Sequence, residues 1–330
     1  MDVPACHVRA AAILDEFAVR TGLTSAAKPR RYLWTDAFAV YTWLGLGRVD
    51  LAQRLVQQVH EVLGVSRDPQ HPTARGLRIG KPLPERAPDE PFDPELEWER
   101  DGQYYHYLTK WLHALERTAR VTGEERYHRW ALELAQAAHR AFAYPPGAPT
   151  RLYWKMSIDL SRPLVPSMGM HDPLDGLVAT ATLGLERETR ELARMCEGRR
   201  WATDDPLGAG GLLLDALGLA RLGVEPLLAQ VLADAEISVA AAARSIGLGS
   251  PAARRLAFRE LGLALGLHAV EQLNTNRLVA FVPLAARLED FWLEPAHQAA
   301  ASWTEHRDIN AVTLAACLAP EGTLNSGQRP

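Results

Sequence analysis

Hydrophobic residues recur every three or four positions along most of this chain, which is the spacing of one face of an α-helix, whereas strict alternation is scarce. Glycine-containing turns separate helical segments at Leu46–Asp50, Val121–Glu125 and Leu222–Glu225. The pattern predicts an all-α protein of twelve helices in six antiparallel pairs, at 5–20, 34–46, 49–63, 103–121, 124–142, 173–186, 188–198, 207–222, 226–245, 253–267, 270–287 and 306–318.

The predicted helices alternate in character. Segments 207–222 and 253–267 are apolar almost all the way round, so we expect them to be buried on every side, whereas 49–63 and 124–142 carry a polar face. This alternation predicts two concentric layers, as in an (α/α)6 toroid formed by one domain over residues 1–330. A linear helical solenoid would alternate in the same way, but the absence of a fixed repeat favours the closed ring.

Two long connections interrupt the helical pattern. Residues 64–100 are rich in proline and acidic towards their end, and residues 143–170 include the aromatic segment Arg151–Met156, which resembles a short strand or hairpin. Loops of this length in a compact domain are usually lids or binding loops, and an interdomain linker is the alternative for 64–100.

Polar clusters begin the helices that follow the long connections. In a ring of antiparallel pairs every second connection emerges on the same face, so one face would carry most of the candidate chemistry. The clusters are Trp34-Thr35-Asp36, Asp101 to His106, His171 to Asp175, Asp204-Asp205 and His306 to Asn310.

Composition excludes several classes of function. A net charge of −4 and a pI near 6.3 give no support for nucleic-acid binding. Three widely spaced cysteines form neither a disulfide framework nor a zinc motif. The N-terminus lacks the order of a signal peptide, and the longest apolar stretch, Gly210–Leu219, is too short to span a bilayer. We expect a soluble cytoplasmic protein that has neither a membrane nor a nucleic-acid partner.

Aspartates at the predicted helix starts could perform glycoside hydrolysis, which needs two carboxyl groups about 5–10 Å apart. We assign Asp36 and Asp172 as acid and base, and place Asp175 and Asp308 in the substrate site. The alternative is ordinary helix capping, which is the better interpretation for Asp204 and Asp205 before Pro206.

Histidines offer a rival chemistry. His106, His171 and His306 each fall at a predicted helix start, and two imidazoles across a pocket could transfer protons next to a sugar carbonyl. His171 and His306 would tune the catalytic carboxylates or replace them. No two of the three lie four residues apart on one helix, so we expect neither a metal nor a cofactor.

Aromatic and basic residues complete the predicted site. Aromatic rings stack on the apolar faces of sugars, so Trp34, Tyr104 and Trp154, together with His106, are expected to line it. Lys155 and Arg307 could bind an anionic group such as a uronate carboxylate.

Two segments resemble a known superfamily. The stretch Leu33-Trp34-Thr35-Asp36-Ala37-Phe38 is similar to the Trp-Thr-x-Gly-Phe stretch of unsaturated glucuronyl hydrolases, with Ala37 in place of the glycine. The run Leu115 to Tyr127 resembles the Thr-Gly-Asp-x-x-Tyr hairpin corner of six-hairpin glycosidase (α/α)6 toroids. The histidine arrangement is similar in outline to N-acylglucosamine 2-epimerases.

The resemblance implies a carbohydrate-active enzyme with its pocket at the N-termini of the inner helices. We expect a glycoside hydrolase that uses paired carboxylates and acts on a small-molecule or oligosaccharide substrate. A sugar epimerase or isomerase that uses paired histidines is the first alternative, and a non-catalytic helical binding scaffold is the second. The sequence leaves homo-oligomerisation open.

Overall fold

The computed structural model describes residues 2–273 and 275–325, and it is 63% helical with only small sheets. Contacts divide the described chain into two compact units. Unit 1 comprises residues 2–17, 45–47 and 198–325 without residue 274, and unit 2 comprises Ala18–Leu44 and Arg48–Glu197.

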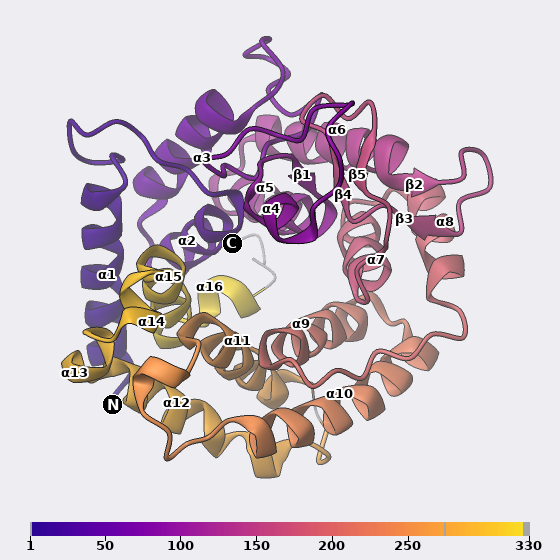
Figure 1. Cartoon of the computed structure of the whole chain (residues 1–330). Coiled ribbons are helices and arrows are strands. Elements are labelled where there is room, and N and C mark those ends of the chain that lie inside the picture. The colour runs from indigo at the N-terminus through magenta and orange to yellow at the C-terminus, as the bar shows by residue number, and fades with distance from the viewer. Residues whose placement is uncertain (1, 274, 326–330) are drawn as a thin grey trace. The chain divides into compact units, whose positions relative to one another are not determined.

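Unit 2 contains seven helices in its described residues, and Figure 1 shows them in two layers. Helix α5 packs against α3, α6 and α7, and α7 packs against α8. Thus α2, α5 and α7 form one layer, and α3, α6 and α8 cover it. The bounds are α2 (Leu33–Gly45, of which Gly45 belongs to unit 1), α3 (Val49–Leu63), α4 (Pro94–Glu99), α5 (Tyr105–Thr122), α6 (Glu125–Phe142), α7 (Asp172–Thr182) and α8 (Glu186–Cys196).

Five short strands lie between these helices. Strands β1 (Gln103–Tyr104), β4 (Lys155–Met156) and β5 (Pro163–Val165) form an antiparallel sheet, and β2 (Ala143–Tyr144) pairs with β3 (Arg151–Leu152). The segment Arg151–Met156 therefore contains two short strands, as expected, but they belong to different sheets and do not form a hairpin with each other. Because β1 leads directly into α5, the sheet fixes where that helix starts.

Unit 1 also has two layers. Helix α9 packs against α10 and α11, and α11 packs against α12 and α15, so α9, α11 and α15 form one layer, with α10 and α12 against it (Figure 1). Its longer helices are α1 (Val3–Arg20, in this unit up to Phe17), α9 (Pro206–Leu222), α10 (Glu225–Ser245), α11 (Ala257–His268), α12 (Pro283–Leu293) and α15 (Arg307–Leu318). The short ones are η1 (Ala252–Arg254), η2 (Ala269–Gln272), η3 (Val279–Phe281), α13 (Pro295–Gln298), α14 (Ala301–Thr304) and α16 (Glu321–Leu324).

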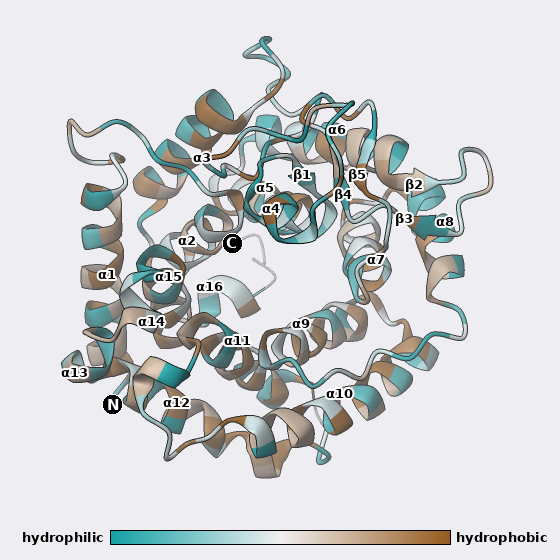
Figure 2. Ribbon diagram, viewed as in Figure 1, coloured by the Kyte–Doolittle hydropathy of each residue, from teal (hydrophilic) through white to brown (hydrophobic). Residues whose placement is uncertain are grey.

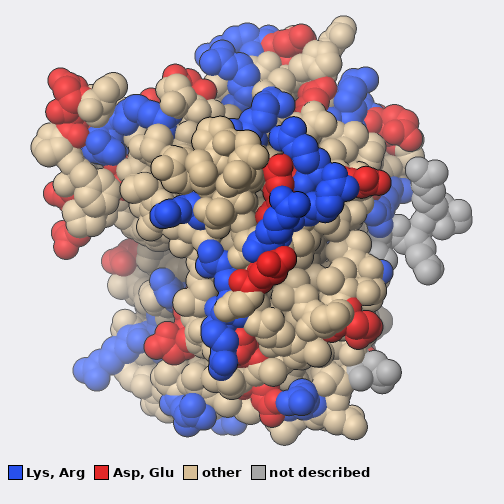
Figure 3. All heavy atoms as spheres, turned by 90° about the vertical axis from the view of Figure 1, so that its right-hand side faces the viewer, with Lys and Arg blue, Asp and Glu red and all other residues tan. Residues whose placement is uncertain are grey.

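The expected difference between buried and half-exposed helices is present. Figure 2 shows teal along α8, a covering helix, whereas α9 is largely white and brown. Helices α9 and α11 approach closely at Gly210, where an added Cβ would lie 2.1 Å from the carbonyl oxygen of Gly262. Positively and negatively charged side chains both occur on the face shown in Figure 3.

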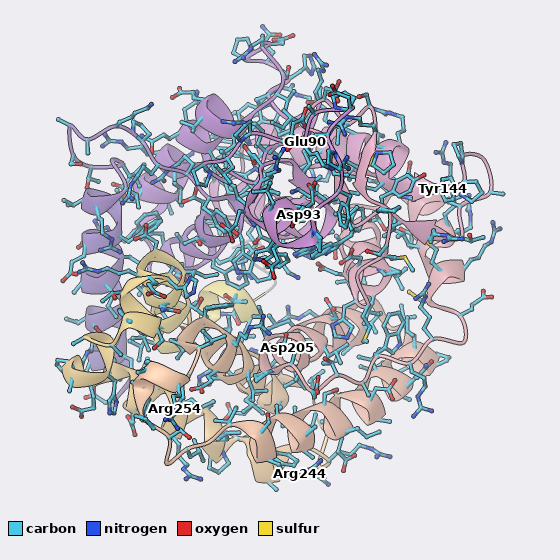
Figure 4. All side chains as sticks on the ribbon, in the orientation of Figure 1. Glu90, Asp93, Tyr144, Asp205, Arg244 and Arg254 are labelled. Carbon is cyan, nitrogen blue, oxygen red and sulfur yellow. The ribbon has the colours of Figure 1, made fainter. Side chains whose placement is uncertain are left out.

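Aspartate caps two of the helices. Asp205 accepts a hydrogen bond from the backbone N–H of Gly208 at the start of α9, which confirms the capping interpretation for this residue (Figure 4). Asp93 accepts bonds from the N–H groups of Glu95 and Leu96 and starts α4 in the same way. Each cap satisfies backbone donors that a helix leaves without a partner.

One predicted helix is wrong. The segment 270–287 is not one helix, because two short 3-10 turns precede α12, which begins at Pro283. Proline has no N–H to donate inside a helix but suits its first turn, so it starts α12 instead of continuing an earlier helix. Helix α4, within the connection 64–100, was not predicted.

Helix α10 has 21 residues, and of the helices in the described residues it alone is long and apolar enough to cross a membrane by length and composition. Such a helix is weak evidence by itself, because the core helix of a folded protein passes the same test. In this protein α10 packs along α9, and 39% of its most apolar stretch is buried.

Candidate active site

The starts of α5 and α7 bring a histidine and an aspartate together in unit 2. His106 Nδ1 lies 3.8 Å from Asp172 Oδ1, which is too long for a hydrogen bond. Nδ1 is buried without a hydrogen-bond partner among the described residues, although the His106 side chain as a whole is 27% exposed. Two of the polar clusters predicted to share a face therefore do meet.

Asp172 is a buried carboxyl group with little to stabilise its charge. It accepts a hydrogen bond of 3.2 Å from the N–H of Gly169, and an added Cβ on that glycine would lie 2.5 Å from Asp172 Oδ1. Burial, reinforced by the negative charge of Asp175, raises the pKa of Asp172 to about 7. The group can thus hold a proton near neutral pH.

Asp175, one helical turn further along α7, has the opposite environment. Its carboxylate accepts bonds of 2.5 Å from Thr109 Oγ1 and 2.8 Å from Lys110 Nζ, and His113 Nε2 lies 3.9 Å away. Burial alone would raise the pKa of Asp175, but the charge of Lys110 and the contact with His113 outweigh it and hold this pKa well below the ordinary value. Asp175 is therefore ionised and helps to keep Asp172 protonated.

His106 lies within a cluster of aromatic rings, called the aromatic cluster below. Its imidazole stacks on Tyr104 at 5.4 Å and on Trp154 at 6.3 Å, and Trp34 meets it edge-on at 6.0 Å. Burial lowers the pKa of His106 to about 4, so the imidazole is neutral at pH 7. The members of the cluster are Trp34, Trp98, Tyr104, His106, Tyr107 and Trp154.

Trp98, Lys110 and His113 lie at the site but were not predicted from the sequence. Trp98 projects from α4, is 51% exposed and stacks on Trp154 at 5.5 Å. The sequence feature that could have identified Trp98 is an aromatic residue in an acidic segment that begins with a proline. We interpreted this segment only as part of a loop. Lys110 and His113 lie inside a predicted helix, four and seven residues after His106, on the same face. That spacing could have identified them.

Two predicted site residues lie in buried ion pairs. Asp36 is 3.3 Å from Arg31 NH1, is almost fully buried and accepts a bond from the N–H of Tyr32. Lys155 is fully buried and donates to Glu97 Oε1, Glu97 O and Arg100 O, so all three hydrogens of its ammonium group have protein acceptors. Lys155 therefore ties β4 to α4 and has no donor left for a substrate, contrary to the predicted binding role.

The other predicted residues are distributed between the units. His171 immediately precedes α7 in unit 2, and its side chain does not cap that helix. His306, Arg307 and Asp308 are at the start of α15 in unit 1, where the His306 ring lies 5.7 Å from Phe258 and Arg307 lies 3.8 Å from Glu16. The structure therefore does not place these three relative to Asp172. Among the described residues, no group of three or more His, Cys, Asp or Glu side chains is arranged to hold a metal ion.

Comparison with solved structures identifies the fold. The chain is similar to an α-mannanase of family GH76 from Bacteroides thetaiotaomicron, with a TM-score of 0.63 and 10% identity over 99% of this chain and 98% of that one. It is also similar to the cellobiose 2-epimerase of Spirochaeta thermophila (TM-score 0.55, 12% identity, 92% and 96% covered) and to that of Bacillus thermoamylovorans (0.51, 11%, 79% and 75%).

The likeness is one of fold, and it confirms the predicted all-α (α/α)6 toroid. No protein-family model and no curated protein matches the chain.

Proposed function

We propose that this protein is a carbohydrate-active enzyme that hydrolyses glycosides, with Asp172 as the proton donor to the leaving oxygen. The observation that carries the proposal is the pair of aspartates on α7, whose surroundings drive their pKa values apart. A carboxylic acid kept protonated near neutral pH beside an ionised carboxylate is the usual arrangement for general acid catalysis of this reaction. In this proposal Asp175 maintains the proton on Asp172.

The aromatic cluster supports a saccharide as the substrate. Trp34 and Trp154 are half-buried and Trp98 is half-exposed, so ring surface remains available beside His106 and Asp172. Aromatic faces of this kind bind the apolar C–H faces of sugars. The solved structures of similar fold, an α-mannanase and cellobiose 2-epimerases, make oligosaccharides the first substrates to test.

His106 supports a second candidate function, sugar epimerisation. A neutral imidazole 3.8 Å from a protonated carboxyl group supplies a base and an acid side by side. In such a step His106 would take the proton from the carbon next to the carbonyl of an open-chain sugar while Asp172 donates its proton to the carbonyl oxygen, which gives an enediol. After rotation of the enediol, return of the proton from His106 to the other face of that carbon, with the enediol proton going back to Asp172, completes the epimerisation. The predicted partner for this chemistry, His306, lies in unit 1, so the proposal rests on His106 and Asp172.

The test is to incubate the protein with α-mannan oligosaccharides and cellobiose in D₂O and to follow the products by NMR. Hydrolysis yields new reducing ends without deuterium at C2, whereas epimerisation exchanges the hydrogen at C2. Asp172→Asn should lower kcat by at least about 100-fold. Because Asp172 must be protonated, wild-type activity should fall as the pH rises through about 7.

The control is Asp205→Asn, which also precedes a proline at a helix start and keeps its capping ability. This variant should retain wild-type activity. Full activity of Asp172→Asn would overturn the assignment. Saccharide binding without turnover in the wild type would instead support a non-catalytic scaffold.

A further inference from the structure

Lys81 places an ammonium group against the aromatic cluster without a carboxylate partner. Its Nζ lies 4.8 Å from the centroid of the Trp98 ring and 5.7 Å from that of Tyr104. It donates a hydrogen bond to the carbonyl oxygen of Trp98 and has no ion pair within the described part of the chain. An ammonium group has three hydrogens, so two remain for a ligand.

Three carboxylates act on the charge of Lys81, namely Glu99, Asp101 and Glu97; Glu97 and Asp101 are already paired with other cations, and Glu99 makes no ion pair with Lys81. Glu97 binds Lys155 at 2.8 Å and Arg86 at 2.9 Å. Asp101 binds Arg78 at 2.9 Å and accepts a bond of 3.0 Å from the N–H of Gly80. Glu97 and Asp101 therefore do not neutralise the ammonium group of Lys81, which forms no ion pair among the described residues.

The backbone fixes the position of Lys81. Gly80 has a φ of 96°, and an added Cβ would lie 2.2 Å from the carbonyl oxygen of Arg31. Any other residue at position 80 would be strained and would collide with that carbonyl. The close contact holds the neighbouring Lys81 at one place beside the cluster.

Tyr104 connects Lys81 to the proposed catalytic residues. Its ring, over which Lys81 lies, is 5.4 Å from the His106 ring. Tyr104 is 2% exposed, yet its hydroxyl has no hydrogen-bond partner among the described residues. A buried hydroxyl is normally satisfied, and a bound ligand is one source of the missing bond.

We propose that Lys81 and Trp98 form a subsite for a saccharide that carries an anionic substituent, namely a carboxylate, sulfate or phosphate. This inference rests on the proposed function and defines its substrate class. The half-exposed indole of Trp98 stacks on the sugar ring, and the free hydrogens of Lys81 bind the anion. The role that the sequence analysis gave to Lys155 thus passes to Lys81.

The pH dependence of binding follows from the surroundings of Lys81. Burial, reinforced by the charge of Lys155, lowers the pKa of Lys81 to about 8, whereas Glu97, Glu99 and Asp101 act in the opposite direction. Tyr104, the other titratable group against it, stays protonated because burial raises its pKa. Affinity for the anionic saccharide should therefore fall as the pH rises through about 8, while affinity for a neutral one should not.

Calorimetric titration of the full-length protein tests the proposal with three probes: a uronate oligosaccharide, its carboxyl-reduced neutral form and a sulfated oligosaccharide of similar length. The variants are Lys81→Met, Lys81→Arg and the exposed control Lys28→Met. Lys81→Met should weaken binding of an anionic probe roughly ten- to a hundredfold and leave the neutral probe unchanged. Lys81→Arg should keep most of the affinity, and Lys28→Met all of it.

The comparison of uronate with sulfated probe identifies which anion the subsite accepts. Equal affinities of wild type and Lys81→Met for every probe would overturn the proposal. Because binding is measured without turnover, this failure differs from a failure of the proposed catalysis, in which the probes bind but are not converted.

Discussion

Asp172 and Asp175 show how two identical side chains one helical turn apart acquire different protonation states. Asp175 has Thr109 and Lys110 as hydrogen-bond donors, whereas Asp172 has one backbone N–H and the neighbouring charge of Asp175. The donors decide which carboxyl group ionises, because both are buried to a similar extent. Lys110 keeps Asp175 ionised, and the charge of Asp175 raises the pKa of Asp172, although the charge of Lys110 itself acts on Asp172 in the opposite direction.

The raised pKa of Asp172 has a consequence for stability. Its folded-state pKa of about 7 exceeds the ordinary value of 3.8, so protonation favours the folded state and this contribution is lost as the pH rises from about 4 to 7. The Asp172→Asn variant has no carboxyl group at this position, so its folded state does not lose this stability as the pH rises. We expect the variant to be more stable than the wild type at pH 8, on the order of 2 kcal/mol in urea denaturation, and about equal at pH 4. Equal stability at both pH values would contradict the raised pKa.

At the scale of residues, the sequence predicted which residues lie near the site better than it predicted their interaction partners. Asp172, His106 and Trp34 were expected near one another because each follows a long connection, and the structure brings them together. Asp36 follows the same rule, yet Arg31 pairs with it in the core. A position at a helix start is local information, whereas an ion-pair partner depends on folding that the local pattern does not contain.

At the scale of elements, the glycines of α9 have different roles although they are neighbours in sequence. An added Cβ at Gly210 would meet the backbone of Gly262 on α11, whereas at Gly211 it would meet nothing within 4 Å. Close packing against α11 is therefore found at Gly210 and not at Gly211. Helix-to-helix contact depends on the exact face, which a three-residue glycine pattern does not define.

This difference gives a matched pair of variants. Gly210→Ala should destabilise the protein by about 1–3 kcal/mol, because α9 and α11 must move apart. Gly211→Ala should stabilise it by about 0.5–1 kcal/mol, because alanine is the better helix former and has open space. Thermal and urea unfolding would measure the change in stability of each variant. A destabilised Gly211→Ala variant together with an unaffected Gly210→Ala variant would contradict the close contact between α9 and α11.

Most helices were predictable because amphipathic periodicity is strong over ten or more residues. The failures were α4, with only six residues, and the segment 270–287, where apolar residues continue across a break. Helix α4 is held by Glu97, whose side chain accepts from Lys155 and Arg86. Its stability therefore comes from tertiary contacts, and periodicity does not report those.

At the scale of the whole molecule, the number of unfolding transitions distinguishes two possibilities. A single domain, as predicted from the sequence, unfolds in one transition, whereas two independent units would unfold in two. Helix α1 crosses from unit 1 to unit 2 between Phe17 and Ala18, so the two units share a continuous helix. We expect one cooperative thermal transition by calorimetry, with equal calorimetric and van't Hoff enthalpies. Two resolved transitions would show that the units unfold independently.

The chain has only four lysines, and their surroundings give them very different reactivity towards acylating reagents. Lys155 is inaccessible and Lys110 is bound to Asp175, whereas Lys28 is exposed. With a pKa of about 8, roughly a quarter of Lys81 is unprotonated at pH 7.5, against about one in a thousand for an ordinary lysine. Lys81 should therefore be the most readily acylated of the four lysines, and a saccharide bound beside the neighbouring aromatic rings should protect it.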